Sequence, residues 1–423
     1  MAVRIRYMGN KHGIAPDVAR IVEATFERRR PFLDLFCGMC SVGGAISCSG
    51  RRVWGNDVQR FAALVAECLL TNPERPPGVT ETTAALLDPF TKNRSALMDR
   101  FDADLAVEER LLERPSLSSY RRAHDAWRHA GNDEALANEV SDLTSAPSSF
   151  PYRLAALTFA WGYLGIAQAI AIDSIRFALD AAERDARLTP AQASWGRLAL
   201  LQATSVMAST PGHFAQYLRA ATDESLVRIV RQRKRDAWVQ FLHELSLLSP
   251  YGSTRWRAKN VVLQGDALVL WPQLDALNFR RGVVYADPPY SKDHYSRYYH
   301  VLETLARYDY PAANGQGRYR PDRFATAFSL KRSVRESFEV LCGEVAARDH
   351  ALILSYPTNG LLSEEDVAET LRGYFSDIQL VLRKATLHST LGARHGSQHN
   401  LVEELVWLAR TKRSSRKLLV HHA

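Results

Sequence analysis

The chain has 423 residues, of which 46% are hydrophobic and 24% are charged. A chain of this length can bury a large core, most naturally in two domains, and its net charge of +8 permits a polyanionic partner without establishing one. The five cysteines form an odd set with no second close pair, which argues against a zinc site and fits reduced thiols in a cytoplasmic protein. Arg4, Arg6 and Lys11 interrupt the apolar run that a signal peptide requires, so we expect no signal peptide here.

In chain order, the first elements alternate between strand and helix. Residues Phe32 to Phe36 and Val53 to Gly55 are typical of parallel strands, with a helical stretch from Gly43 to Ser49 between them and a helix from Phe61 to Leu70 after them. From Thr71 to Arg257 the pattern becomes helical. Further strands are then predicted at Asn260 to Leu263, Gly282 to Ala286, Ala351 to Ser355, Ile378 to Leu382 and Leu401 to Ala409. The sequence therefore predicts an α/β domain interrupted by a helical block.

Within the helical block, residues 154 to 172 carry no charge over a length that could span a bilayer. Gly162, Gly165 and Gln168 lie inside this stretch, however, and Asp173 and Arg176 continue its pattern. We expect a buried helix and no membrane association.

Acidic residues follow the predicted strands. Asp34 begins a turn that contains Gly38, while Asp57 and Asp266 come after the next two strands and Asp287 after another. An acid at the end of the second strand suits hydrogen bonding to ribose hydroxyls, and glycines in the first turn suit a close approach of backbone N–H groups to a ligand. Each acid alone could equally be a helix N-cap or a turn residue. Together they predict a nucleoside-bearing cofactor across the sheet edge.

The most informative segment is the strand Val283 to Ala286 followed by Asp287, Pro288, Pro289 and Tyr290. The prolines end the strand because they lack an N–H and fix φ. The Asp287 carboxylate and the Pro288 carbonyl can each accept one N–H from a planar amine, while the Tyr290 ring can stack on the base that carries it. A strand followed by a simple proline turn is the alternative.

Two basic segments are candidate nucleic-acid contacts. Lys292 and Arg297, directly after the proline turn, can hold phosphates, although the same segment also fits a helix that buries its apolar and aromatic side chains: Tyr298, Tyr299, Leu302 and Leu305. The densest basic run contains Arg231, Arg233 and Arg235, which can contact DNA phosphates or form a solvated helix face.

These motifs resemble those of the Dam-type, alpha-group DNA adenine methyltransferases. The resemblance rests on the segment from Tyr7 to Lys11, the loop from Asp34 to Gly38, the pair Asn56-Asp57 and the unaltered catalytic motif from Asp287 to Tyr290, in the order of the alpha group. It covers about residues 4–70 and 260–409. Cys40 departs from the family pattern, in which a second loop glycine is expected.

The resemblance implies S-adenosylmethionine as the cofactor, double-stranded DNA as a partner and a prokaryotic or phage-encoded source, and it allows a cognate restriction nuclease. The residues it places at the cofactor are Tyr7, Gly9, Lys11, Asp34, Phe36, Gly38, Asp57, Asp266 and Asp287. Lys11 could equally contact a DNA phosphate.

We therefore expect a Rossmann-like methyltransferase domain over residues 1–70 and 258–410, a helical target-recognition insert over 71–257 and a basic tail over 411–423. The expected activity is site-specific transfer of a methyl group to the N6 amine of a flipped adenine, in a restriction–modification or defence system. RNA adenine, the N4 amine of cytosine in DNA, and a catalytically silent DNA-binding protein of the same fold are the alternatives.

Overall fold

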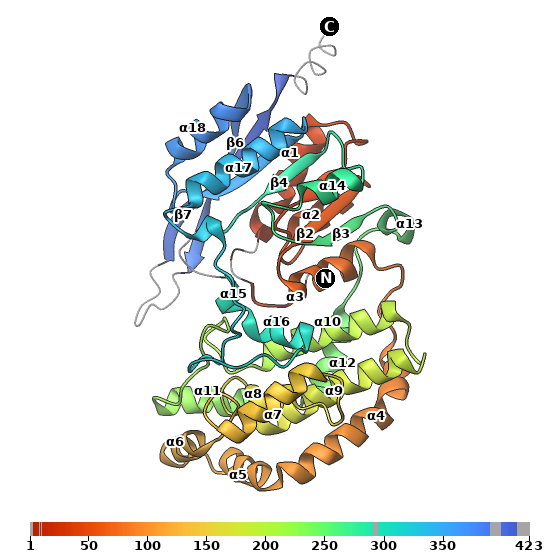
Figure 1. Cartoon of the computed structure of the whole chain (residues 1–423), viewed down its shortest axis with the longest axis vertical. Helices are drawn as coiled ribbons and strands as arrows, with labels where there is room; N and C mark the ends of the chain where they lie inside the picture. Colours follow the sequence, from red (N-terminus) through yellow and green to blue (C-terminus); the bar gives the residue numbers. More distant parts are fainter. Residues whose placement is uncertain (1–2, 8, 10, 291–294, 390–398, 413–423) are drawn as a thin grey trace. The chain divides into compact units, whose positions relative to one another are not determined.

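The structure is a computed structural model that describes residues 3–7, 9, 11–290, 295–389 and 399–412. The chain forms two compact units, each assembled from three segments (Figure 1). The helical unit comprises Met1–Met8, Pro73–Pro250 and Ser296–Arg323. The sheet unit comprises Gly9–Asn72, Tyr251–Tyr295 and Phe324–Ala423.

The sheet unit is built on a sheet that has seven strands in the described part of the chain, in the order β3-β2-β1-β4-β5-β7-β6. Strands β1 to β5 are parallel, and β7 runs antiparallel to its neighbours β5 and β6. The chain leaves β1 for β2 on one side, and β4 lies on the other side of β1. The strand order thus reverses at β1, and in open α/β sheets such a point forms the ligand-binding crevice.

Helices cover both faces of this sheet. On one face, α14, α17 and α18 pack against the strands in a core that includes Leu33, Trp54 and Leu352. On the other face the helices approach closely at glycines: a Cβ built at Gly55 of β2 would lie 3.6 Å from the Cβ of Ala66 in α3. This arrangement confirms the predicted α/β class with helices on both faces.

The elements of the sheet unit agree with the predicted strands. Their bounds are η1 Lys11–Gly13, α1 Ala15–Thr25, β1 Phe32–Asp34, α2 Ser41–Ser47, β2 Val53–Asp57, α3 Arg60–Ala66, η2 Glu67–Thr71, α13 Thr254–Arg257, β3 Val261–Gln264, α14 Trp271–Ala276, β4 Val283–Ala286, η3 Ala327–Ser329, α17 Val334–Ala347, β5 Ala351–Pro357, α18 Glu364–Tyr374, β6 Asp377–Ser389 and β7 His399–Arg410. The predicted helix after β2 is present, but its last turn, η2, is a π-helix.

The helical unit contains the long helices of the predicted insert. Their bounds are α4 Val79–Arg100, α5 Asp102–Glu113, α6 Leu117–Ala126, α7 Glu134–Ser145, α8 Leu154–Thr158, α9 Ile166–Arg184, α10 Pro190–Met207, α11 Asp223–Arg233, α12 Ala237–Leu247 and α16 His300–Arg307. The short helix α15, Tyr295–Tyr298, precedes α16.

The charge-free stretch of residues 154–172 is buried but not one helix. It is divided between α8 and α9 because Trp161, between them, adopts a left-handed backbone with φ of 60°. The carboxylate of Asp173 accepts the N–H groups of Ala155 and Ala156 at 2.8 and 2.9 Å, which ties α9 to the start of α8. In the described part of the chain, no helix has the length and apolar character that crossing a membrane requires.

The segment after the proline turn packs with the helical unit, which differs from its predicted place in the methyltransferase domain. Phe214 N donates to Tyr298 O at 2.8 Å, and the Tyr308 hydroxyl donates to Asp173 at 2.6 Å. The side chains expected to form a buried helix face here, Tyr298, Tyr299, Leu302 and Leu305, are all buried.

Candidate active site

Acidic residues gather at the carboxyl ends of four neighbouring strands. In sheet order, Asp266 follows β3, Asp57 ends β2, Asp34 ends β1 and Asp287 follows β4. The register pairs Asp34 with Gly55 of β2 and Tyr285 of β4, which brings the strand ends level with one another. The structure therefore unites the four predicted acids at the edge where the strand order reverses.

The loop between β1 and α2 is fixed by two of these acids. Asp57 accepts the Gly38 N–H at 3.0 Å, and Asp34 accepts the Gly43 N–H at 3.2 Å. Gly38 has a φ of 45°, and Cys40 has a φ of 57° where the family pattern expects a second glycine. The loop thus forms a left-handed turn without that glycine. This backbone conformation is less favourable for Cys40 than for glycine, because the β-carbon of Cys40 crowds the backbone.

Burial makes the Asp34 carboxyl unusually basic. Its side chain is buried, and this desolvation raises its pKa to about 7 against the opposing effect of the Gly43 N–H, with the charges of Asp287 and Asp57 adding to the rise. Carboxylates crowded in this way favour a cation at the site, because a positive charge offsets their mutual repulsion.

Asp266 is placed differently from the other acids. It is exposed, and its carboxylate accepts the Leu268 N–H at 2.9 Å within its own turn. Its neighbour in space, Asn56, donates from its side chain to the carbonyls of Leu35 and Gly265 at 3.1 and 3.0 Å. Asn56 thereby ties together the carboxyl ends of β1, β2 and β3.

Asp287 belongs to a cluster of charged groups in which Glu404 is buried and Lys11 and Asp287 are half-buried. Lys11 Nζ lies 3.0 Å from Asp287 Oδ1 and 2.9 Å from Oε1 of Glu404, and the Ser355 hydroxyl also donates to Glu404. Burial raises the pKa of Asp287 to about 7; Lys11 opposes this shift and Glu404 adds to it. The Lys11 ammonium also lies 5.4 Å from the centroid of the Tyr290 ring. Lys11 therefore holds the candidate catalytic acid and the aromatic ring in one place.

Glu404 and Ser355 are members of this cluster that the sequence interpretation missed. Glu404 is buried in β7, opposite Pro357 at the end of β5, where Ser355 lies. Two adjacent acids, Glu403 and Glu404, between apolar residues of one strand are the sequence signal that could have identified it. Neighbouring residues of a strand face opposite sides, so one of the two acids faces inward and requires a partner.

The remaining predicted cofactor residues lie in different surroundings. Gly9 has a φ of 73°, and a Cβ there would lie 2.7 Å from the Tyr295 hydroxyl, so the position requires glycine. Phe36 makes an edge-on contact with Phe328, with ring centroids 5.5 Å apart. Tyr7 belongs to the helical unit and stacks on Tyr299, with centroids 4.7 Å apart.

The predicted phosphate contacts require one correction. Arg233 is buried: it forms an ion pair with Glu108 at 3.4 Å, donates to the carbonyl of Trp161 at 2.8 Å and lies over the Tyr120 ring. It is therefore a structural residue of the helical unit and is not available to DNA. Arg231 and Arg235 are exposed.

Of the two predicted phosphate contacts after the proline turn, Lys292 and Arg297, only Arg297 is among the described residues. Arg297 is exposed and donates to the Tyr319 hydroxyl at 3.0 Å, while Lys292 lies outside the described residues. Among the residues described, no group of three or more His, Cys, Asp or Glu side chains is arranged to hold a metal ion.

A comparison with protein-family models matches residues 7–103 to the D12 class N6 adenine-specific DNA methyltransferases. Over these residues the chain is similar to this class. The matched residues include β1, the glycine loop and β2, and they therefore contain most of the residues predicted to bind the cofactor.

Curated relatives extend this similarity along the chain. Modification methylase LlaI of Lactococcus lactis subsp. lactis is 23% identical over 88% of this chain and 49% of its own length. Modification methylase StsI of Streptococcus sanguinis is 21% identical over 98% of this chain and 53% of its own length. Type II methyltransferase M.FokI of Planomicrobium okeanokoites is 34% identical over 93 residues, 22% of this chain and 14% of its own length. The chain thus spans about half the length of the first two relatives.

Proposed function

We propose that this chain is an S-adenosylmethionine-dependent DNA methyltransferase that modifies the N6 amine of adenine, of the kind that acts in restriction–modification. The observation that carries the proposal is the position of Asp287, Pro288, Pro289 and Tyr290 directly after β4, beside the point where the strand order reverses. The match of residues 7–103 to the D12 class and the modification methylases among the relatives support it.

The residues present suit this cofactor. S-adenosylmethionine carries a sulfonium and an amino group, both cationic. Buried Asp34 and Asp57 and half-buried Asp287 line one edge of the sheet. Asp57 is already oriented by the Gly38 and Gln59 N–H groups, at 3.0 and 2.9 Å, and a carboxylate at the end of the second strand suits hydrogen bonding to ribose hydroxyls. When bound, the cofactor supplies the electrophilic methyl group.

The protein's own contribution is to orient the amine. The N6 lone pair is delocalised into the adenine ring, so the amine is a weak nucleophile. When Asp287 and the Pro288 carbonyl accept its two hydrogens, the nitrogen is favoured in a pyramidal form whose lone pair points away from the ring plane. Orientation and electrostatics then supply most of the catalysis. The base must first leave the duplex and stack on Tyr290, at a cost of a few kcal/mol that pocket contacts offset.

Methyl transfer to unmodified DNA, followed by modified-base sequencing, tests the proposal. We expect N6-methyladenine at one sequence, and loss of transfer in Asp287→Ala. The control variant Asp88→Ala changes an exposed acid of α4 and should transfer at the wild-type rate. N4-methylcytosine, methylated RNA alone, or cofactor binding without any transfer would contradict the proposal and favour the corresponding alternative.

A further inference from the structure

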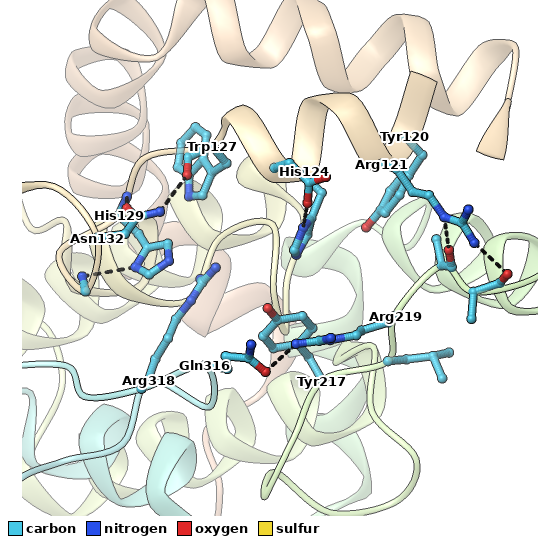
Figure 2. A pocket seen from close by; sticks show the side chains of 16 residues that line it. Tyr120, Arg121, His124, Trp127, His129, Asn132, Tyr217, Arg219, Gln316 and Arg318 are labelled. Atoms are coloured by element: carbon cyan, nitrogen blue, oxygen red, sulfur yellow. Dashed lines mark hydrogen bonds and ion pairs between the residues drawn. The ribbon is translucent and has the colours of Figure 1, made fainter. Parts of the chain in front are cut away.

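The helical unit contains a cavity of about 660 Å³ that the proposed chemistry does not use (Figure 2). Three segments of the chain form its walls: α6 with the loop that follows it, residues 217–221, and residues 315–318. A volume of this size is typical of sites that hold an organic ligand of some tens of atoms.

Aromatic rings form much of the wall. The His124 ring lies 6.5 Å from the Tyr120 ring and 5.6 Å from the Tyr217 ring, centroid to centroid. Trp127 also lines the cavity, and its buried indole N–H has no hydrogen-bond partner among the described residues. Rings at this spacing offer faces on which a planar group can stack.

A buried arginine lies beside these rings. The Arg318 residue is 3% exposed, and its guanidinium donates to the carbonyls of Thr158 and Ala160 at 2.7 and 2.5 Å. Its Nε has no hydrogen-bond partner within the described part of the chain, and the side chains that act most strongly on its charge are tyrosines and Arg233, with no carboxylate among them. Burial lowers the pKa of Arg318 to about 10, as expected of a cation without a counter-ion.

Two more arginines lie at the rim. Arg121 donates to the carbonyls of Ala220 and Ala221 at 2.8 and 2.6 Å, and Arg219 donates to the side chain of Gln316 (Figure 2). Of the lining residues, all of them described, Asp125 is the one acid, and its side chain is exposed. The cavity therefore combines stacking surfaces with an excess of positive charge.

We propose that this cavity binds a nucleotide, with the base stacked against Tyr217 and the phosphate facing Arg219 and Arg318. Guanidinium groups bind phosphate through paired N–H donors, and aromatic rings accept any base face. The nucleotide can be an unpaired residue of the DNA substrate or a free nucleotide. The DNA source rests on the proposed function, whereas the free nucleotide does not.

Calorimetric titration of the full chain with deoxyadenosine monophosphate tests the assignment. We expect measurable binding that weakens at least tenfold in Tyr217→Leu and in Arg219→Gln. The matched control is Arg122→Gln, which removes the same charge from an exposed position on α6 that does not line the cavity, and it should bind as the wild type does.

Three results would overturn the assignment: no nucleotide binding at millimolar concentration, equal affinity in the two cavity variants and the wild type, or inorganic phosphate binding as tightly as the nucleotide. Competition by single-stranded DNA identifies the strand as the source, and its absence identifies the free nucleotide. Methyl transfer is measured on the same preparations, so nucleotide binding without transfer would contradict the proposed function and leave this assignment intact.

Discussion

Two charges of opposite sign act on the candidate catalytic carboxylate. Lys11 stabilises the ionised form of Asp287 from 3.0 Å, and Glu404, bound to the same ammonium, destabilises it. Because the amine hydrogens need an acceptor, the ionised form of Asp287 is the active one. Lys11 is therefore a positioning residue that also sets the pH at which the site works.

This network predicts opposite shifts in the pH dependence of methyl transfer. The rate should rise with pH through about 7, the raised pKa of Asp287. Lys11→Met removes the charge that lowers this pKa, so the acidic limb should move to higher pH. Glu404→Gln removes the charge that raises it, so the limb should move to lower pH.

The pH–rate profiles of the two variants and the wild type check this prediction. If Lys11 only contacts DNA phosphate, Lys11→Met would change the KM for DNA and leave the acidic limb of the pH–rate profile in place. That result would contradict the interaction of Lys11 with Asp287 and Glu404.

Asp57 is expected to govern cofactor affinity. Asp57→Ala removes a charged acceptor and also releases the Gly38 N–H of the cofactor loop. Loss of a charge-assisted hydrogen bond typically costs about 1.5–3 kcal/mol, or roughly ten- to hundredfold in affinity. Isothermal titration with S-adenosylmethionine measures it, with exposed Asp142→Ala as the control. Unchanged affinity would show that Asp57 only orients the loop and does not bind the cofactor.

Residue patterns could predict the acids but not their partners. Asp34, Asp57, Asp266 and Asp287 are recognisable because each follows a short apolar run, and parallel strands bring such ends to one edge. Glu404 lies more than a hundred residues from Asp287, and only the antiparallel pairing of β7 with β5 brings it near. The residues around Glu404 do not indicate that β7 pairs with β5.

At the scale of elements, helix α11 shows why a run of like charges is ambiguous. Successive residues of a helix are separated by about 100°, so Arg231 and Arg233 point roughly 200° apart. One is exposed and the other buried against Glu108, which itself accepts the N–H groups of Ile166 and Ala167 at the start of α9. Arg233 thus joins α11 to α5 and α9.

Replacing Arg233 should therefore destabilise the helical unit. Arg233→Met leaves the buried Glu108 carboxylate without its cation, which typically costs about 3–5 kcal/mol when one partner of a buried pair is removed. Arg231→Met, on the exposed face, should change stability by less than about 0.5 kcal/mol. Urea unfolding of both variants measures the difference; equal midpoints would contradict the buried role.

The strands were predictable because β-branched and aromatic runs bounded by turns have few other interpretations. The break between α8 and α9 was not, since the left-handed backbone of Trp161 is rare for a large side chain. An apolar, charge-free stretch looks the same whether it forms one helix or two.

For the whole molecule, the basic charge is expected to act through surface arginines. Exposed Arg231 and Arg235 remain candidates for phosphate contact, and changing both to Ala should weaken binding on every duplex alike. Each lost contact reduces the slope of log K against log salt by about 0.9, so the double variant should lose roughly 2.

Binding assays over a salt series measure that slope. The control double variant Arg184→Ala with Arg372→Ala removes the same charge from other exposed positions. Equal slopes in the two double variants would show that the pair is only a solvated surface.

The interleaving of the two units limits how the helical unit can be exchanged between relatives. Residues 296–323 supply Tyr308 to Asp173 and Arg318 to the carbonyl of Thr158, although they follow the catalytic motif in the chain. A chimaera that exchanged Pro73–Pro250 alone would remove Asp173 and leave Tyr308 and Arg318 facing the side chains of a foreign segment. Exchange of Met1–Met8, Pro73–Pro250 and Ser296–Arg323 together is the smallest graft that carries the complete helical unit, and its junctions fall where the chain passes from one unit to the other.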